Sequence, residues 1–216
     1  MAEKTTLKYY FSVEGETEKL YLEHLAALIN QSDKSICKVV FNTKVCTPSS
    51  FVKRVSFLQN IKINHLFDVE STEPEYEKRF KNTLDNMKLA ETSGKAVQYF
   101  PGYTNLTFEL WMILHKVDCN GSVSDRKNYL VGINKAFNLS YQGLKEYKEE
   151  KHFKQVLNQI SLVDVKEAVR RADIIMRENK KRGYKPNNYL NYSWYSENPS
   201  TEVGNVIGNI LSNCGL

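Results

Sequence analysis

The sequence of 216 residues lacks the features that mark disulfide-rich, zinc-binding and membrane-spanning proteins. Its four cysteines (Cys37, Cys46, Cys119 and Cys214) have no paired spacing, which argues against a disulfide framework and a zinc knuckle. No apolar run approaches the roughly 20 residues needed to cross a bilayer. The opening MAEKTTLKYY contains no apolar segment of the secretory kind. We therefore expect reduced thiols, a cytoplasmic location and no membrane association.

A strong excess of charge of either sign is also missing. Lysine and arginine number 30 against 25 aspartates and glutamates, for a net charge of +5. The hydrophobic fraction of 41% and charged fraction of 25% are those of an ordinary globular protein. The length suits one core, or a core with an appended lobe. The mildly basic balance is compatible with a polyanionic partner such as nucleic acid, without identifying one.

The first half of the chain alternates strand-like and helix-like segments. The predicted strands are Leu7–Val13, Ile36–Phe41, Ile63–Phe67 and Ala96–Phe100. The predicted helices that follow them are Thr17–Ile29, Phe51–Leu58, Glu75–Ala90 and Leu106–His115. This order predicts the α/β class, with a mostly parallel four-stranded sheet covered by helices on both faces.

The second half has no such alternation. Leu162–Arg182 is the clearest helix, because its apolar residues fall on one face and Gly183 follows it. A second helix is predicted near the C-terminus, over Thr201–Leu211. The segment between them reads as a loop whose aromatic side chains either stack on unpaired bases or pack on the core: Tyr189, Tyr192, Trp194 and Tyr195. We expect an α/β core over 1–118 and a C-terminal helical lobe over 119–216 that packs on it.

Carboxylates follow two of the predicted strands. Glu14 comes directly after the first strand, and Asp68 and Glu70 follow the third. Such residues either stabilise the first turn of a helix, by roughly 0.3–1 kcal/mol, or hold a divalent metal. Because ligand sites in parallel sheets form beyond the carboxyl ends of the strands, we favour a magnesium or manganese ion held by these three acids. Gly15 would let the backbone turn close to that ion.

Four motifs, VEGETEKLYLEHL, FDVE, LTFELWMILH and NPSTEV, occur in the order and spacing of a known bacterial family. Through them the chain resembles the RloB family, whose members are small Toprim-like proteins associated with restriction loci and abortive phage defence. The resemblance spans most of the chain. It implies a Toprim-like core, magnesium-dependent chemistry on DNA or RNA, and in some cases a partner ATPase of the ABC or SMC type.

The resemblance also implies roles for particular residues. Glu14 corresponds to the strand-one glutamate, Asp68 and Glu70 fill the Asp-x-Asp slots that hold magnesium, and Glu109 and His115 correspond to the acid and histidine of the fourth helix. Two departures stand out. Glu70 replaces the second aspartate, and NLT stands where a Ser-Asn-Pro-like run often precedes Phe-Glu-Leu-Trp.

Alternatives remain open from the residues alone. Glu18 reads as a helix-capping carboxylate, with a role in orienting the site as the second interpretation. Glu109 is either the partner of a buried base or part of the active centre, and we favour the second. The preferred function is a magnesium-dependent nuclease in phage defence. The alternative is a non-catalytic module that binds nucleic acid or a partner ATPase. Nucleotidyl transfer is a third option, for which the sequence offers no nucleotide pocket.

Overall fold

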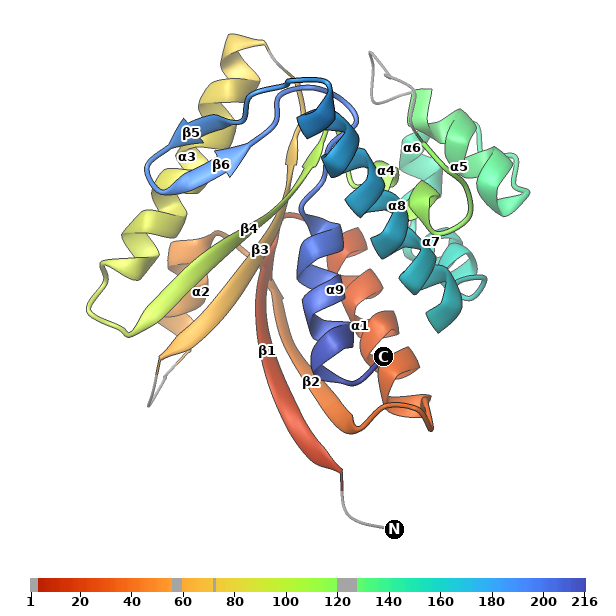
Figure 1. Ribbon diagram of the computed structural model, residues 1–216, viewed down its shortest axis with the longest axis horizontal. Helices are drawn as coiled ribbons and strands as arrows, with labels where there is room; N and C mark the ends of the chain where they lie inside the picture. Colours follow the sequence, from red (N-terminus) through yellow and green to blue (C-terminus); the bar gives the residue numbers. More distant parts are fainter. Residues whose placement is uncertain (1–3, 56–59, 72, 120–127) are drawn as a thin grey trace.

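The computed structural model describes residues 4–55, 60–71, 73–119 and 128–216. Four strands of the first half form one parallel sheet in the order β2-β1-β3-β4 (Figure 1). They are β1 (Thr5–Val13), β2 (Cys37–Val45), β3 (Ile61–Val69) and β4 (Val97–Asn105). The predicted α/β class is therefore confirmed, and the sheet is consistent with a Toprim-like core.

Helices connect the strands as the sequence predicted. They are α1 (Glu16–Gln31), α2 (Pro48–Arg54), α3 (Pro74–Glu91) and α4 (Glu109–Leu114). The helix α2 begins earlier than expected, with Pro48 in its first turn. Most of the end of the predicted helix Phe51–Leu58 lies outside the described residues. The helix α4 is shorter than predicted, because β4 continues to Asn105 and Leu106 takes a left-handed φ of 61° before the helix starts.

Each face of the sheet carries its own hydrophobic cluster. On one face, Phe11 and Leu66 pack with α1, α4 and the C-terminal helices. On the other, Phe67 and Tyr99 pack with α2 and α3. Alternate residues of a strand point to opposite faces, which is why the neighbours Leu66 and Phe67 belong to different clusters. The sheet is thus held between two helical layers (Figure 1).

The helices of the second half of the chain pack on the face of the sheet that also carries α1 and α4. They are α5 (Tyr129–Phe137), α6 (Leu144–Tyr147), α7 (Glu150–Leu157), α8 (Leu162–Lys181) and α9 (Val203–Asn213). The start of α8 is fixed by a capping box, in which the Ser161 hydroxyl accepts from the Asp164 amide and the Asp164 carboxylate accepts from the Ser161 amide. The predicted boundary between 118 and 119 stays a prediction.

The aromatic segment expected to be a loop contains a short antiparallel hairpin, β5 (Asn187–Tyr189) and β6 (Tyr192–Trp194). Tyr192 and Trp194 are buried in the cluster that also contains Phe80. The Trp194 and Phe80 ring centroids lie 4.9 Å apart. For these two side chains, packing on the core is the interpretation that the structure supports.

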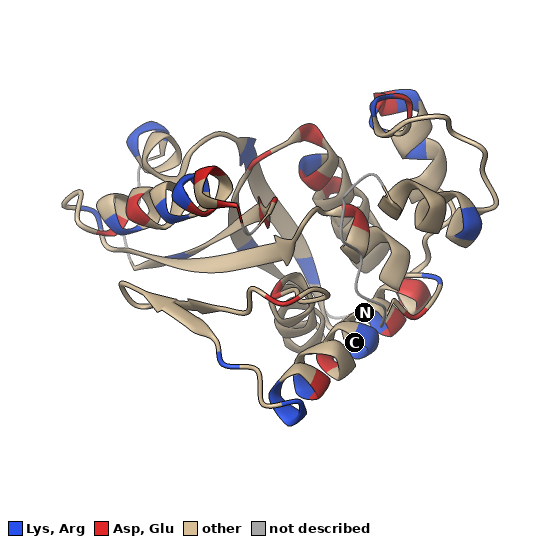
Figure 2. Ribbon diagram, turned by 90° about the horizontal axis from the view of Figure 1, so that it is seen from above, with Lys and Arg blue, Asp and Glu red and all other residues tan. Residues whose placement is uncertain are grey.

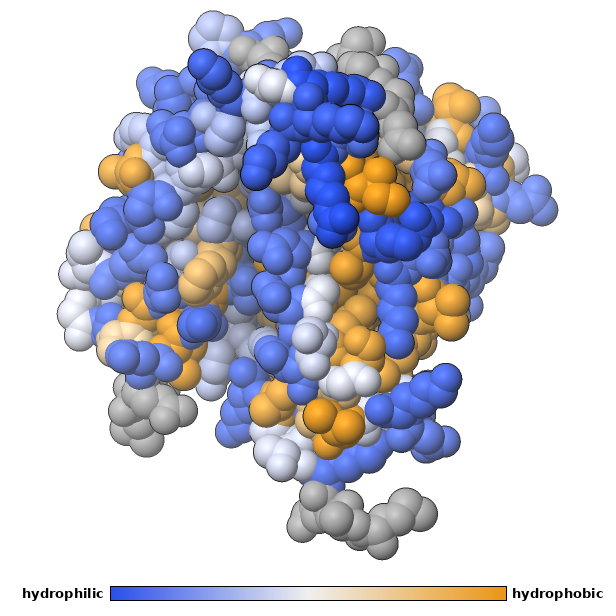
Figure 3. Space-filling model, viewed as in Figure 1, coloured by the Kyte–Doolittle hydropathy of each residue, from blue (hydrophilic) through white to orange (hydrophobic). Residues whose placement is uncertain are grey.

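The surface mixes charges of both signs. Acidic and basic positions alternate along α3 (Figure 2), where Arg79 pairs with Glu75 and Lys81 with Glu77. On the face seen in Figure 3, apolar residues show in separate areas between polar ones. Among the described residues, no helix combines the length and apolar character that a membrane span requires.

Candidate active site at the strand ends

Two of the acids predicted at the strand ends, Glu14 and Asp68, lie side by side. Because β1 and β3 are parallel neighbours, Val13 pairs with Leu66 and the two strands end at the same edge of the sheet. The Glu14 amide donates to the Leu66 carbonyl at 3.1 Å, and the Asp68 amide donates to Glu14 Oε2 at 3.0 Å. The strand order also makes the β1/β3 edge the point where the connections switch direction, which is where open α/β sheets bind ligands.

Two further glutamates, from helices, complete an acid cluster with this pair. Glu18 lies in the first turn of α1 with 4% of its surface exposed, and Glu109 begins α4 with 1% exposed. Burial raises the pKa of the Asp68 carboxyl well above its ordinary value. The negative charges of Glu18, Glu14 and Glu109 raise the same pKa further. We call Glu14, Glu18, Asp68 and Glu109 the acid cluster.

From the sequence, Glu18 was expected mainly to cap α1, and a role in the site was only the second interpretation. Burial raises the pKa of its carboxyl to about 7, with a further upward contribution from the charge of Glu109. Its own backbone amide, the ammonium of Lys148 and the Thr17 hydroxyl act in the opposite direction. Glu18 therefore takes part in the electrostatics of the site as well as lying in the first turn of α1.

Lys148, at the C-terminal end of α6, is the residue that sequence analysis missed. Its Nζ lies 3.0 Å from Glu109 Oε1, and the Thr107 hydroxyl donates to Glu109 Oε2. Burial by itself would lower the pKa of Lys148, but the charges of Glu109, Asp68 and Glu18 raise it on balance. No signal singles this lysine out, since it stands in the highly charged run LKEYKEEK.

Glu70 lies just beyond β3, which ends at Val69. Its Oε2 is 4.0 Å from Nη1 of Arg79, a residue of α3. The causes that raise the pKa of Asp68 are burial and the charges of Glu18, Glu14 and Glu109, of which Glu18 belongs to α1 and Glu109 to α4. The role of Glu70 as a metal ligand stays a prediction.

Gly15 serves the site in a different way from the one expected. Its φ of −135° is ordinary extended backbone, so the turn itself does not require glycine. A Cβ at this position would lie only 2.8 Å from Glu18 Oε2. The missing side chain therefore provides space for the Glu18 carboxyl.

His115, the histidine implied by the resemblance, is buried behind the cluster. Its Nδ1 lies 3.0 Å from the Trp111 carbonyl, and its Nε2 lies 3.2 Å from the Tyr21 hydroxyl. Burial lowers the pKa of His115 to about 4, so the ring is neutral at pH 7. The Tyr21 contact joins the end of α4 to α1, and the Trp111 contact caps the helix that begins with Glu109.

The chemistry of the acid cluster fits a divalent cation that keeps several of its waters. Among the residues that the structure describes, no three His, Cys, Asp or Glu side chains form a ready-made metal cage. Magnesium needs no such cage, because it is often bound through one or two carboxylates with water completing its shell. The pKa of Asp68 is raised first by burial and then by repulsion from Glu18, Glu14 and Glu109, and a cation would relieve that repulsion.

The fold and the cluster together define a class, a parallel α/β protein with carboxylates gathered at the ends of its central strands. A family model described as RloB-like protein matches residues 9–210. Because this match covers nearly the whole chain, the chain belongs to the RloB-like family, and the resemblance noted in the sequence is confirmed. Comparison with curated proteins and with solved structures gave no match.

Proposed function

We propose that this chain is a magnesium-dependent nuclease that hydrolyses phosphodiester bonds of DNA or RNA in defence against phage. One observation carries the proposal, the approach of Glu14 and Asp68 at the switch point of the sheet. Glu18 and Glu109 surround this pair with further negative charge. Family membership supports the same reading, since the resemblance to RloB proteins implies a Toprim-like centre.

The residues divide into those that would hold the ion and those that support them. Glu14 and Asp68 would hold magnesium or manganese, with Glu70 as the third predicted ligand. When bound, such an ion polarises a phosphoryl oxygen and lowers the pKa of a coordinated water. Glu109 holds Lys148 at the edge of the acid cluster. The ammonium there attracts the anionic phosphate of a nucleic acid and offsets part of the repulsion from the carboxylates.

A specific observation favours the second candidate, a non-catalytic module that binds nucleic acid or a partner ATPase. Lys148 already neutralises part of the acid cluster from within the chain. A module of this kind would bind without a divalent ion, and its binding would survive replacement of the acids. A partner ATPase of the ABC or SMC type fits either candidate and is proposed from the resemblance alone.

The test is cleavage of single-stranded DNA, double-stranded DNA and RNA with magnesium or manganese, and with a chelator. We expect metal-dependent cleavage that falls at least about 100-fold in Asp68→Asn, a loss of about 2.7 kcal/mol of barrier lowering. Asp33→Asn is the matched control, because Asp33 is an exposed aspartate between α1 and β2. Absence of cleavage by the unmodified chain, or equal cleavage by Asp68→Asn, overturns the proposal.

A further inference from the structure

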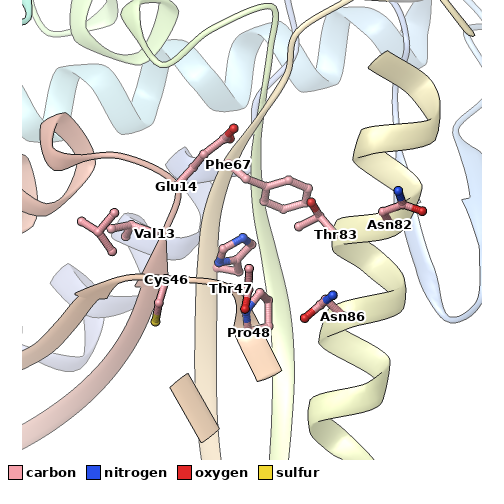
Figure 4. A pocket seen from close by; sticks show the side chains of 11 residues that line it. Val13, Glu14, Cys46, Thr47, Pro48, Phe67, Asn82, Thr83 and Asn86 are labelled. Carbon is pink, nitrogen blue, oxygen red and sulfur yellow. The ribbon is translucent and has the colours of Figure 1, made fainter. Parts of the chain in front are cut away.

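A cavity of about 410 Å³ adjoins the acid cluster on the α2 and α3 side of the sheet. Glu14 lies at its upper rim in Figure 4, and Phe67 extends across it toward Thr83 of α3. Asn86 points into the cavity from the next turn of α3, opposite Thr47, the N-cap residue of α2. Its volume is at the small end of ligand sites, which span about 300–1,000 Å³. The cavity therefore suits one ring system with its attached sugar.

Away from its rim the cavity is uncharged. Of its described lining residues, Glu14 alone carries a formal charge at pH 7. Burial lowers the pKa of His65 to about 4, which keeps that imidazole neutral. The other polar lining groups are amides, hydroxyls and the Cys46 thiol. The cavity therefore suits an uncharged molecule with hydrogen-bonding groups at its edges.

One wall of the cavity is a stack of flat rings. The His65 and Phe67 ring centroids are 5.0 Å apart with an interplanar angle of 28°. Phe67 stacks in turn on Phe80 of α3, at 5.0 Å and 19°. The stack holds the two lining rings in fixed orientations, since each is packed on the next. Because the faces of Phe67 are covered by His65 and Phe80, the wall offers ring edges to a ligand, and an edge-to-face contact is a favourable arrangement for a planar ring such as a nucleobase.

The polar groups offer one donor and one acceptor of fixed type. The Ser49 hydroxyl donates to Asn86 Oδ1 at 2.6 Å, so the amide nitrogen of Asn86, which only donates, is the group that an occupant of the cavity would meet. His65 Nδ1 lies 3.0 Å from the Ser12 carbonyl and 2.8 Å from the Ser12 hydroxyl. With its proton on Nδ1, the neutral ring presents Nε2 as an acceptor. A nucleobase edge carries both complementary groups.

We propose that this cavity, lined by His65, Phe67, Thr83 and Asn86, is a subsite for a single nucleobase of the nucleic-acid substrate. This inference rests on the proposed function, because the position of the cavity beside the acid cluster matters only if the cluster cleaves nucleic acid. Glu14 belongs both to the rim of the cavity and to the acid cluster. A base seated on the aromatic wall therefore places its own phosphate beside Glu14 and Asp68, where the phosphodiester bond would be hydrolysed.

The experiment uses neutral nucleosides, which carry the base without any phosphate and need no metal. Adenosine, guanosine, cytidine and uridine are titrated separately into the ¹⁵N-labelled full chain with a chelator present. The side-chain amide signals of Asn82 and Asn86 are followed by NMR, and Asn82, which also lines the cavity, reports binding in Asn86→Asp. The test variant is Asn86→Asp, which replaces the donating nitrogen by an oxygen that Ser49 can still reach. Asn158→Asp makes the same chemical change at an exposed position on the far lobe.

We expect at least one nucleoside at millimolar concentration to shift the Asn86 signal. Asn86→Asp should weaken its binding about fivefold or more, as loss of one hydrogen bond and gain of repulsion require, while Asn158→Asp binds as the unmodified chain does. No shift with any nucleoside, or equal binding by Asn86→Asp, overturns the subsite. Nucleoside binding without any cleavage would instead remove the nuclease proposal and leave the subsite standing.

Discussion

At the scale of single residues, the Glu18 carboxyl links the site to the pH dependence of folding. Its pKa is about 7 in the folded chain, against 4.5 when solvated. Between these values the folded state holds a proton that the unfolded state has released. Glu18 therefore contributes stability below about pH 4.5, and that contribution is lost as the pH rises through about 7.

Glu18→Gln should flatten this dependence, because glutamine cannot ionise. In urea unfolding with a chelator, the unmodified chain should lose more stability than Glu18→Gln between pH 5 and pH 8. The difference should be about 2–3 kcal/mol, since each tenfold preference for one protonation state is about 1.4 kcal/mol. The neutral histidines contribute equally to both proteins and cancel. Parallel pH profiles would mean that the Glu18 carboxyl is ionised in the folded state.

The ion pair between Lys148 and Glu109 gives a second prediction. The Glu109 side chain is 1% exposed, and its cation is 39% exposed. Lys148→Met leaves a buried carboxylate unpaired, and we expect it to lower the free energy of unfolding by about 1–3 kcal/mol, less than for a fully buried pair. The double variant Lys148→Met/Glu109→Gln should recover most of the loss. A single variant within about 0.5 kcal/mol of the unmodified chain would show that the pair contributes little.

Sequence reasoning found those members of the site that depend on local pattern. Glu14 and Asp68 were predictable because each lies at the carboxyl end of an apolar strand, Glu14 just after β1 and Asp68 just before the last residue of β3, and parallel strands end at the same edge. Lys148 was not predictable, because its approach to Glu109 depends on how α6 packs against the core. Gly15 was noticed for the wrong reason. Its value lies in the space left for Glu18, which only the structure shows.

At the scale of elements, the strands were predictable in place but not in length. The fourth was expected over Ala96–Phe100, and Pro101 and Gly102 come directly after it. It continues to Asn105 because β4 is an edge strand, where a proline costs no ladder hydrogen bond on the open side. The hairpin of β5 and β6 was not predictable from a turn motif in the sequence. Leu190 occupies a turn position with φ 54°, where asparagine or glycine is usual.

Packing between α8 and α9 gives a prediction at the same scale. A Cβ on Gly204 of α9 would lie 2.5 Å from the Cβ of Ala172 in α8. Gly204→Ala should therefore lower stability by about 1–3 kcal/mol despite the better helix propensity of alanine. Gly143→Ala is the control, because nothing lies within 4 Å of its added carbon. The free energies of unfolding of both variants are measured in urea. A Gly204→Ala chain more stable than the unmodified one would show that the two helices can separate without cost.

At the scale of the whole molecule, the second half of the chain completes the first. Tyr147 and Phe153 share a hydrophobic cluster with Phe11 and Leu22 of the sheet and α1. The same packing brings Lys148 to Glu109. The predicted core over 1–118 holds the carboxylates, and the predicted lobe over 119–216 supplies their cation. The site is therefore expected to depend on the intact chain rather than on the sheet alone.

The most direct test of a metal held at the strand ends is crystallographic. Crystals of the full chain soaked in Mn²⁺ should give an anomalous peak about 2.1–2.2 Å from carboxylate oxygens of Glu14 and Asp68, and crystals of Asp68→Asn should give none there. A peak absent from the unmodified chain, lying elsewhere, or persisting unchanged in Asp68→Asn would contradict the account.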